Sequence, residues 1–351
     1  MLRLESGVYI YGAGKLATFI LSHLQNMGIS VKGFIDFKAS ESPVREVGLI
    51  PIDEIERNLP IVISVLNNFV DPGDIAERLA SFSFGEIITP PQIFRFFGQN
   101  DSAVQWYWLS SKQGTSFPMT TRRFLQKHFD NLSNLTLENI YSYRSDGIYR
   151  SNHMLTLDKQ YLETGISDFW DGDIYLLDGG AFDGDTVRSL NANRIFPKRT
   201  YCFEPDLLNY SRLVSNLKTL KSETIPVLAA LGNRCGKSFF NQSSSTASSL
   251  QESISEREVI TVDADSILKS ERISHIKLDL EGGELEALSG MKNIIAENRP
   301  KLAISVYHKP TDLEDVLAFV QDFDFYDQFS LRNYAHQGFE TIFFAASSKS
   351  F

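Results

Sequence analysis

The chain has 351 residues, which is enough for two domains, and its apolar and charged fractions are those of an ordinary soluble globular protein. A formal net charge of −10, with no lysine or arginine block to offset it, argues against nonspecific binding to nucleic acid. Two cysteines are too few for a disulfide framework, and no apolar run reaches the ~18 residues that a membrane span needs.

The first residues lead directly into a predicted strand, without the pattern of a secretory signal peptide. Neither Cys202 nor Cys235 belongs to a Cys-x-x-Cys or Cys/His cluster. We therefore expect a cytoplasmic protein with no membrane span and no nucleic-acid partner. The composition leaves the oligomeric state open, a homo-oligomer included.

A glycine turn of the dinucleotide-binding type follows the first predicted strand, Val8–Tyr11. Residues 12–17 fit the pattern G-x-G-x-x-A, and Asp36 closes a second strand, Val31–Ile35, near the ~20-residue interval of that motif. One interpretation is that Gly12, Gly14 and Asp36 bind NAD or a sugar-nucleotide. The other is that this α/β fold serves packing, dimerisation or sensing.

Three more elements complete this N-terminal region. We predict a strand over Ile61–Val65, a helix over Ile75–Phe82 that begins near Asp74, and a strand over Ile87–Thr89 before Pro90-Pro91. Residues 1–91 are thus expected to form a Rossmann-like domain, similar to the N-terminal unit of some polysaccharide-modifying proteins. No Tyr-x-x-x-Lys lies between residues 51 and 89, which argues against hydride transfer there.

Residues 92–172 form an aromatic-rich connecting region in which we expect several helices. The cluster Trp106-Tyr107-Trp108 is typical of a core or a domain interface rather than of a sugar-binding platform. The polar segments 142–147 and 149–153 are candidates to approach an acceptor substrate.

The most informative stretch, residues 174–186, has the pattern of a strand, a turn and a helix. The apolar run Ile174–Leu177 ends at Asp178, the glycines that follow allow the backbone to pass close to a ligand, and Asp185 or Thr186 can cap the next helix. Open α/β sheets bind their ligands at this edge. The sequence therefore predicts a nucleotide site here.

A second acid supports a nucleoside ligand. Thr200–Phe203 form another apolar run, which ends in Glu204-Pro205, and Asp206 can start a helix over Leu207–Leu220. Glu204 follows Asp178 near the interval at which a βαβ unit brings an acid to a ribose, and a carboxylate there can accept both ribose hydroxyls.

Further along the chain, the alternation of strands and helices continues. We predict a strand over Pro226–Leu231, a solvated loop over Asn241–Ser249, and a strand over Val259–Val262 that leads to the helix cap Asp263. The remaining elements are a helix over Leu285–Glu297, a strand over Leu302–Val306, a helix over Leu313–Phe323, and strands over Phe325–Tyr334 and Glu340–Ala346.

Residues 275–284 carry charges in an unusual place. A strand through this segment puts Lys277, Asp279 and Glu281 on one face, either as a structural ion pair or as functional groups at the carboxyl edge. The next strand delivers His308 to the same edge, where binding or proton transfer and a structural role are equally open.

Five parallel strands with alternating helices and a closing hairpin are the plan of class I S-adenosylmethionine-dependent methyltransferases. We therefore expect residues 173–351 to form a mostly parallel seven-stranded sheet with a C-terminal antiparallel hairpin. The segments that carry the strongest motifs are 178–185, 203–205, 229–232, 276–284 and 286–290. These segments resemble the FkbM family of methyltransferases.

The resemblance implies O-methylation, often of sugars or other hydroxylated natural products, with S-adenosylmethionine as the cofactor. It implies that Asp178, Gly180 and the turn hold the methionine part, and that Glu204 holds the ribose. Phe182 stands where many members carry asparagine, and Asn333 where related sequences often carry histidine. The cofactor-binding candidates in this half are Asp178, Gly179, Gly180, Ala181, Phe182, Asp183, Glu204, Pro205 and Ala230.

Because a sulfonium methyl group is already activated, the protein must mainly align the acceptor oxygen and exclude water. The candidates for a base are Asp279, Glu281 and His308, with Lys277 orienting a carboxylate or the substrate. The acids offer oxygen ligands but no recognisable metal site. Two other functions stay open: an NAD-dependent sugar oxidoreductase or epimerase centred on residues 12–17, and a non-catalytic nucleotide sensor.

Overall fold

Two sheets of mainly parallel strands dominate the computed structural model of the chain, which describes residues 2–44, 46–98, 104–110, 119–218, 220–241 and 256–348. The chain divides into two units. Unit 1 comprises Met1–Gln160, Tyr307–Thr311 and Leu331–Thr341, and unit 2 comprises Tyr161–Val306, Asp312–Ser330 and Ile342–Phe351. The division into 1–91, 92–172 and 173–351 that the sequence favours stays a prediction.

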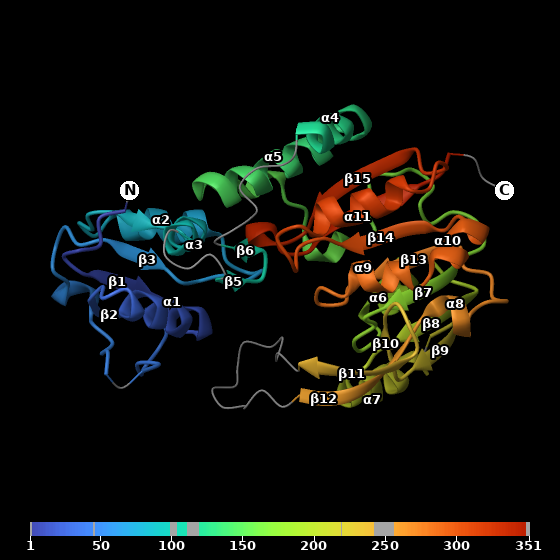
Figure 1. Ribbon diagram of the computed structural model, residues 1–351, viewed down its shortest axis with the longest axis horizontal. Helices are drawn as coiled ribbons and strands as arrows, with labels where there is room; N and C mark the ends of the chain where they lie inside the picture. Colours follow the sequence, from blue (N-terminus) through green and yellow to red (C-terminus); the bar gives the residue numbers. More distant parts are fainter. Residues whose placement is uncertain are drawn as a thin grey trace. The chain divides into compact units, whose positions relative to one another are not determined.

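A four-stranded parallel sheet with the order β2-β1-β3-β4 forms the centre of unit 1 (Figure 1). Alternate residues of β1 face opposite sides: Val8 and Ile10 pack with α1 and α3, whereas Tyr9 packs with α2. Its elements are β1 (Val8–Tyr11), α1 (Lys15–Asn26), β2 (Val31–Ile35), β3 (Ile61–Ile63), α2 (Pro72–Ala80), β4 (Ile87–Ile88) and α3 (Pro90–Phe97).

Two helix starts in unit 1 differ from the expectation. The cap of α2 is Asp71 rather than Asp74, since its carboxylate accepts the Gly73 N–H at 2.7 Å. Pro90-Pro91 begin α3 instead of closing the region, because Thr89 forms a capping box with Gln92 and proline suits the first helical positions.

The connecting region adds a short hairpin and two longer helices to unit 1. Trp108 is 2% exposed and lies in the same core as α1 and α3, as expected, but Tyr107 is exposed. The elements are β5 (Gln105–Trp106), β6 (Leu109–Ser110), α4 (Met119–His128), α5 (Asn131–Asp146) and the 3₁₀ turns Ser151–His153, Leu157–Lys159 and His336–Gly338.

Unit 2 contains the seven-stranded sheet, in the order β15-β16-β14-β13-β7-β8-β9. Five of its strands are parallel and β16 runs antiparallel to β14, which confirms the expected class I plan. The strands are β7 (Tyr175–Gly179), β8 (Arg199–Phe203), β9 (Glu223–Val227), β13 (His275–Leu278), β14 (Lys301–Ser305), β15 (Gln328–Asn333) and β16 (Thr341–Ala346).

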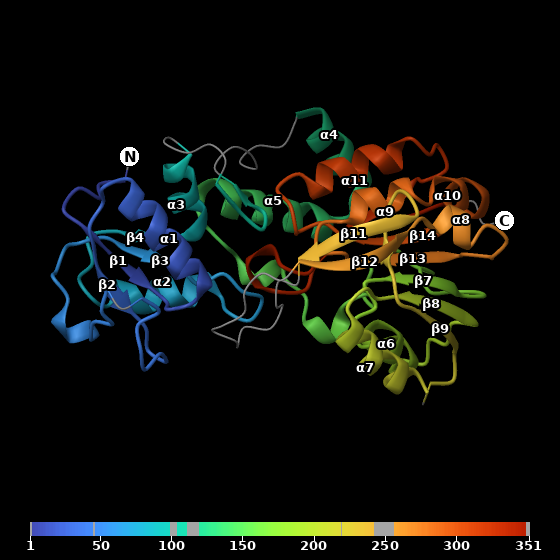
Figure 2. The same cartoon turned by 60° about the horizontal axis from the view of Figure 1, so that its bottom comes forward.

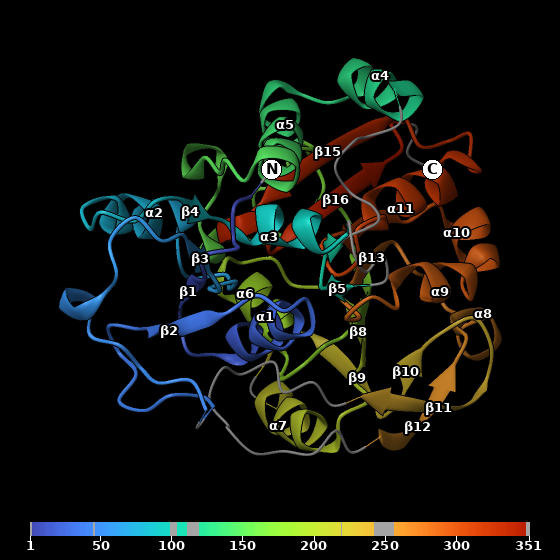
Figure 3. The same cartoon turned by 60° about the vertical axis from the view of Figure 1, so that its left-hand side comes forward.

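Helices cover both faces of this sheet, with α6 and α7 on one side and α9, α10 and α11 on the other (Figures 2 and 3). Leu190 of α6 and Leu213 of α7 pack against Leu176 of β7 in one apolar core. The helices are α6 (Asp185–Ala192), α7 (Leu207–Leu217), α8 (Ala264–Ile267), α9 (Glu284–Ser289), α10 (Lys292–Asn298) and α11 (Asp312–Gln321).

One predicted strand and one predicted helix are each split in two. The strand expected over Pro226–Leu231 divides between the edge strand β9, which tolerates Pro226, and β10 (Ala230–Leu231), which joins β11 (Gly236–Asn241) and β12 (Glu256–Val262) in a separate sheet. The expected loop after Asn241 lies outside the described residues.

The helix expected over Leu285–Glu297 breaks between α9 and α10. A Cβ on Gly290 would lie 1.9 Å from the Gly232 carbonyl oxygen, so this glycine permits a close approach of two backbones. In the described part of the chain, no helix has both the length and the apolar character that crossing a membrane requires.

Candidate active site

Asp178 and Glu204 stand at the carboxyl ends of the neighbouring parallel strands β7 and β8. The turn after β7 is tied to the end of β8, because the N–H groups of Gly180 and Ala181 donate to the Phe203 carbonyl at 3.0 and 2.9 Å. The cap of the following helix is Gly184, not Asp185 or Thr186, and the Asp185 carboxylate accepts the adjacent Thr186 N–H. The two acids therefore share one edge of the sheet.

Gly180 is required by this turn for two reasons. Its φ of +72° lies in the left-handed region, and an added Cβ would lie 1.9 Å from the Asp279 carbonyl oxygen. The turn after β7 thus packs closely against the backbone that follows β13, which fixes the ends of these two neighbouring strands relative to each other.

Glu204 is a buried carboxylate held by two backbone N–H groups. Its Oε2 accepts from Phe182 at 2.9 Å, and its Oε1 accepts from Asp206 at 2.8 Å. Burial raises the pKa of Glu204 to about 7, although these two hydrogen bonds oppose the shift. Each oxygen keeps a lone pair for a further donor.

Lys277 and Asp178 form an ion pair inside the sheet, with Nζ 3.1 Å from Oδ1. The same ammonium donates to the carbonyls of Gly179 and Gly180 at 3.2 and 2.8 Å, so it is bound to the glycine turn as well as to Asp178. Burial lowers the pKa of Lys277, but Asp178 and the other nearby carboxylates outweigh burial and raise it above its ordinary value. Lys277 therefore positions Asp178 and the glycine turn.

Comparison with known proteins agrees with this geometry. The methyltransferase FkbM domain model matches residues 178–329. The chain carries a methyltransferase FkbM domain.

A crystal structure of a methyltransferase FkbM from Methylobacillus flagellatus KT has the same fold, with 19% identity and a TM-score of 0.76, and the match covers 97% of this chain and 90% of that one. A Precorrin-6y C5,15-methyltransferase from Geobacter metallireducens GS-15 gives 11% identity and a TM-score of 0.32 over 57% of this chain and 95% of its own, which is too low to carry an argument. No curated protein matches the chain significantly.

In the FkbM domain, the segment after β13 corrects one expectation. The strand ends at Leu278, so Asp279 and Glu281 are not on its face beside Lys277, and Glu281 is exposed with a φ of +53°. Sequence reasoning missed the role of Glu284, whose buried carboxylate accepts the N–H groups of Leu280 and Gly282 at 2.7 and 3.4 Å. This loop is therefore folded around Glu284.

The other cofactor-binding candidates of the FkbM domain occupy different positions along the same segments. Phe182 has a φ of +46° and is 37% exposed, and Ala181 is fully buried. The carboxylate of Asp183 pairs with Arg188 at 2.7 Å. Pro205 lies between Glu204 and the α7 cap, whereas Ala230 lies on β10, outside the seven-stranded sheet.

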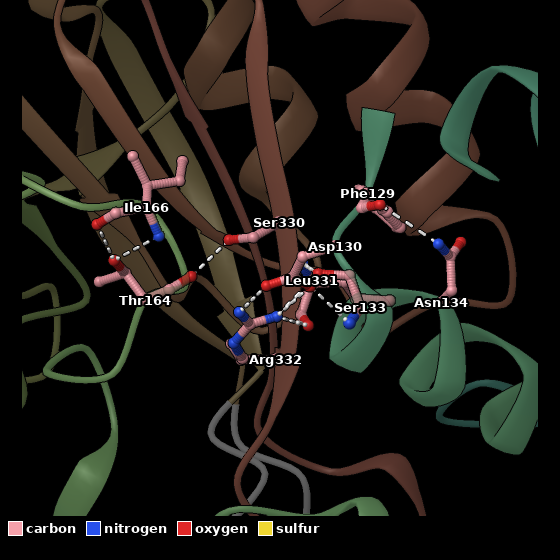
Figure 4. Close-up of polar contacts among 9 residues, drawn as sticks. All are labelled: Phe129, Asp130, Ser133, Asn134, Thr164, Ile166, Ser330, Leu331 and Arg332. Atoms are coloured by element: carbon pink, nitrogen blue, oxygen red, sulfur yellow. Dashed lines mark hydrogen bonds and ion pairs between the residues drawn. The ribbon is translucent and has the colours of Figure 1, made fainter. Parts of the chain in front are cut away.

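Tyr161 is a further member of this site, and it precedes the matched family domain. Its ring lies 5.8 Å from Lys277 Nζ, its φ is +61°, and its carbonyl accepts the Trp170 Nε1–H at 2.6 Å. The segment is held to β15 because Ser330 donates to the Thr164 carbonyl (Figure 4). No motif in the sequence marks Tyr161, since its ring face makes the contact with Lys277.

His308 belongs to unit 1 by its packing and is 6% exposed. Its ring lies 4.1 Å from that of Tyr307. The role of His308 as a base therefore stays a prediction.

The N-terminal glycine turn of unit 1 is accounted for by internal contacts. A Cβ on Gly12 would lie 2.8 Å from Ser64 Oγ, and Asp36 accepts the N–H groups of Ala13 and Lys38 at 3.0 and 2.8 Å. Gly14 faces open space. The comparisons lend no support to NAD or a sugar-nucleotide at these residues, and the Rossmann-like assignment of this region stays a prediction.

Asn333, where the sequence departs from the related pattern, and its neighbour Arg332 have structural partners in unit 1. The Arg332 guanidinium pairs with the Asp130 carboxylate and donates to Ser133 Oγ at 2.7 Å (Figure 4). Asn333 Nδ2 donates to the Phe339 carbonyl and to Thr341 Oγ1. These contacts stabilise α5 and the turn between β15 and β16.

Proposed function

We propose that the FkbM domain transfers the methyl group of S-adenosylmethionine to a hydroxyl of a sugar, a sugar-nucleotide or a related glycan or natural product. The observation that carries the proposal is the pair of buried carboxylates, Asp178 and Glu204, at the ends of adjacent parallel strands. Open α/β sheets bind nucleotides at that edge.

The residues present suit this cofactor. Among the described residues, each oxygen of Glu204 accepts one N–H, which leaves room for two hydroxyl donors of a ribose. Asp178 Oδ2 is buried and accepts no hydrogen bond from the described residues, so it offers an acceptor to a ligand.

The protein does not need to activate the methyl group, since S-adenosylmethionine supplies an activated methyl group when bound. The chain must align an acceptor oxygen and exclude water. We infer that Asp279, Glu281 or His308 takes the hydroxyl proton, and that Lys277 acts by positioning. A cytoplasmic location is part of this proposal.

Calorimetry with S-adenosylmethionine and with NAD tests the cofactor. We expect Glu204→Gln to weaken S-adenosylmethionine about tenfold to a hundredfold, because hydrogen bonds to a charged group contribute ~1.5–3 kcal/mol. The matched control Glu297→Gln, an exposed acid of unit 2, and Gly14→Val in unit 1 should bind as the wild type does.

Binding of NAD without binding of S-adenosylmethionine would exclude the proposal and favour an oxidoreductase or epimerase. A transfer assay with labelled methyl groups over sugars and sugar-nucleotides then identifies the acceptor. Binding of S-adenosylmethionine without methyl transfer to any hydroxyl compound would contradict the proposed O-methylation and favour the alternative of a nucleotide sensor.

A further inference from the structure

Arg144, on α5 of unit 1, is a buried cation without an anionic partner among the described residues. Its side chain is 8% exposed. Only Nη1 donates a hydrogen bond there, to the Pro310 carbonyl at 3.0 Å, and Nε is buried without an acceptor. The Nε and Nη2 edge of the guanidinium is therefore unused by the described chain.

A second unused donor belongs to Trp108, one of the two aromatic side chains near the Arg144 guanidinium, the other being Tyr141. The Arg144 Cζ lies 5.1 Å from the ring centroid of Trp108, and the Nε1–H of Trp108 is buried without a hydrogen-bond partner in the described residues. Trp108 is 2% exposed. Two adjacent side chains thus present donors, and the described chain supplies no acceptor for either.

Arg332 shows how the same unit treats a buried guanidinium whose role is structural. It is 5% exposed, and it pairs with Asp130 through both Nη atoms. Leaving a buried donor unpaired costs about 1–3 kcal/mol, and more for a charged group. The contrast with Arg332 indicates that the anion of Arg144 is not part of the described chain.

We propose that Arg144 and Trp108 form a binding site for an oxyanion, the carboxylate or phosphate group of a ligand. The planar Nε and Nη2 edge matches two oxygens of such a group, and the Trp108 N–H adds a third donor. Pro310 belongs to Tyr307–Thr311, the segment that also contains His308, so the site lies beside the chain that follows β14. This inference concerns binding alone and does not depend on methyl transfer.

The test is calorimetry with inorganic phosphate, sodium glucuronate and glucose, at constant ionic strength, on the full chain. Wild type should bind phosphate or glucuronate saturably and should not bind glucose. Arg144→Gln and Arg144→Lys should each weaken binding about tenfold or more, because neither keeps the planar fork. Trp108→Phe keeps the ring face but loses the N–H, and should weaken binding about tenfold.

Arg95→Gln is the matched control, since Arg95 is an exposed arginine of unit 1, and it should bind as the wild type does. Circular dichroism confirms that each variant is folded. If Arg144→Gln does not fold, Arg144→Lys and Trp108→Phe still test the proposal. Preference for phosphate identifies a phosphorylated ligand, and preference for glucuronate a carboxylate. Absence of saturable binding of both anions to the wild type, or equal binding by the wild type and the Arg144 variants, overturns the proposal.

Discussion

Lys277 and Asp178 are register partners on the adjacent parallel strands β13 and β7, and their ion pair is buried, with side chains 3% and 0% exposed. Removing either partner of a buried ion pair destabilises the fold, because the remaining charge is then unpaired in a low-dielectric interior. The pair therefore links the stability of unit 2 to the geometry of its glycine turn.

Lys277→Met should destabilise the protein by about 3–5 kcal/mol, the cost of leaving one buried charge unpaired. Urea unfolding monitored by circular dichroism measures this change. The double variant Lys277→Met/Asp178→Asn should recover at least half of the loss, and the exposed control Lys269→Met should change stability by less than ~0.5 kcal/mol. A loss below ~1 kcal/mol for Lys277→Met would mean that the pair contributes little.

Affinity for S-adenosylmethionine should depend on pH through Glu204. Burial raises the pKa of this carboxyl to about 7, and under the proposed function only its ionised form would accept both ribose hydroxyls. Affinity should therefore rise about tenfold per pH unit up to pH 7 and level off above it. Calorimetry from pH 5.5 to 8.5 measures how this affinity changes with pH. If the affinity of Glu204→Gln changes as steeply with pH as that of the wild type, another group causes the pH dependence.

Gly180→Ala should be far more harmful than Gly172→Ala. Both glycines have positive φ, but a Cβ at Gly172 meets no atom within 4 Å, whereas at Gly180 it would overlap the Asp279 carbonyl oxygen. We expect a cost of ~1–2 kcal/mol at Gly172 from strain alone, and at least ~2 kcal/mol more at Gly180. Denaturant unfolding of the two variants gives the difference, and equal costs would show that the turn can move away from β13.

Acid should weaken the fold through His275, at the start of β13. Burial lowers the pKa of this imidazole to about 4, although its hydrogen bond to the Phe169 carbonyl opposes the shift. Below pH 6.5 the unfolded chain binds a proton that the folded chain does not, so stability present above pH 6.5 is lost as the pH falls towards 4.

When the pH falls from 7 to 5, the free energy of unfolding of the wild type should decrease by about 2 kcal/mol more than that of His275→Gln. The free energy of unfolding of both proteins, measured in urea at the two pH values, gives the comparison. Equal losses would show that His275 does not control the response to acid.

Much of unit 2 follows from local pattern. An apolar run that ends in an acid and a glycine turn specifies its own strand and loop, which is why Asp178 and Glu204 could be found from the sequence. The cap Asp206 was found for the same reason, since its carboxylate accepts the N–H groups of Leu208 and Asn209, close by in the chain.

The features that were missed depend on contacts between distant residues. The sequence allowed a structural ion pair for Lys277, but its partner Asp178 is set by strand register, and α9 ends where Gly290 meets Gly232. Tyr161 reaches Lys277 through a ring face, a contact that has no signature in residue type or spacing. Arg144 lies in the polar segment 142–147 that the sequence offered as a candidate to approach a substrate, but a buried arginine without an acid is recognisable only once its surroundings are known.

The interleaved course of the chain has a practical consequence for dissecting the protein. Gln337 accepts a hydrogen bond from the Tyr143 hydroxyl and donates to the carbonyls of Asn67 and Val70, all within unit 1. A fragment that stops after Gln160 would lack Gln337, so the Tyr143 hydroxyl and the carbonyls of Asn67 and Val70 would lose these hydrogen bonds. Expressing either half alone would therefore produce an incomplete fold, and point substitutions are the sounder way to assign activities to each part.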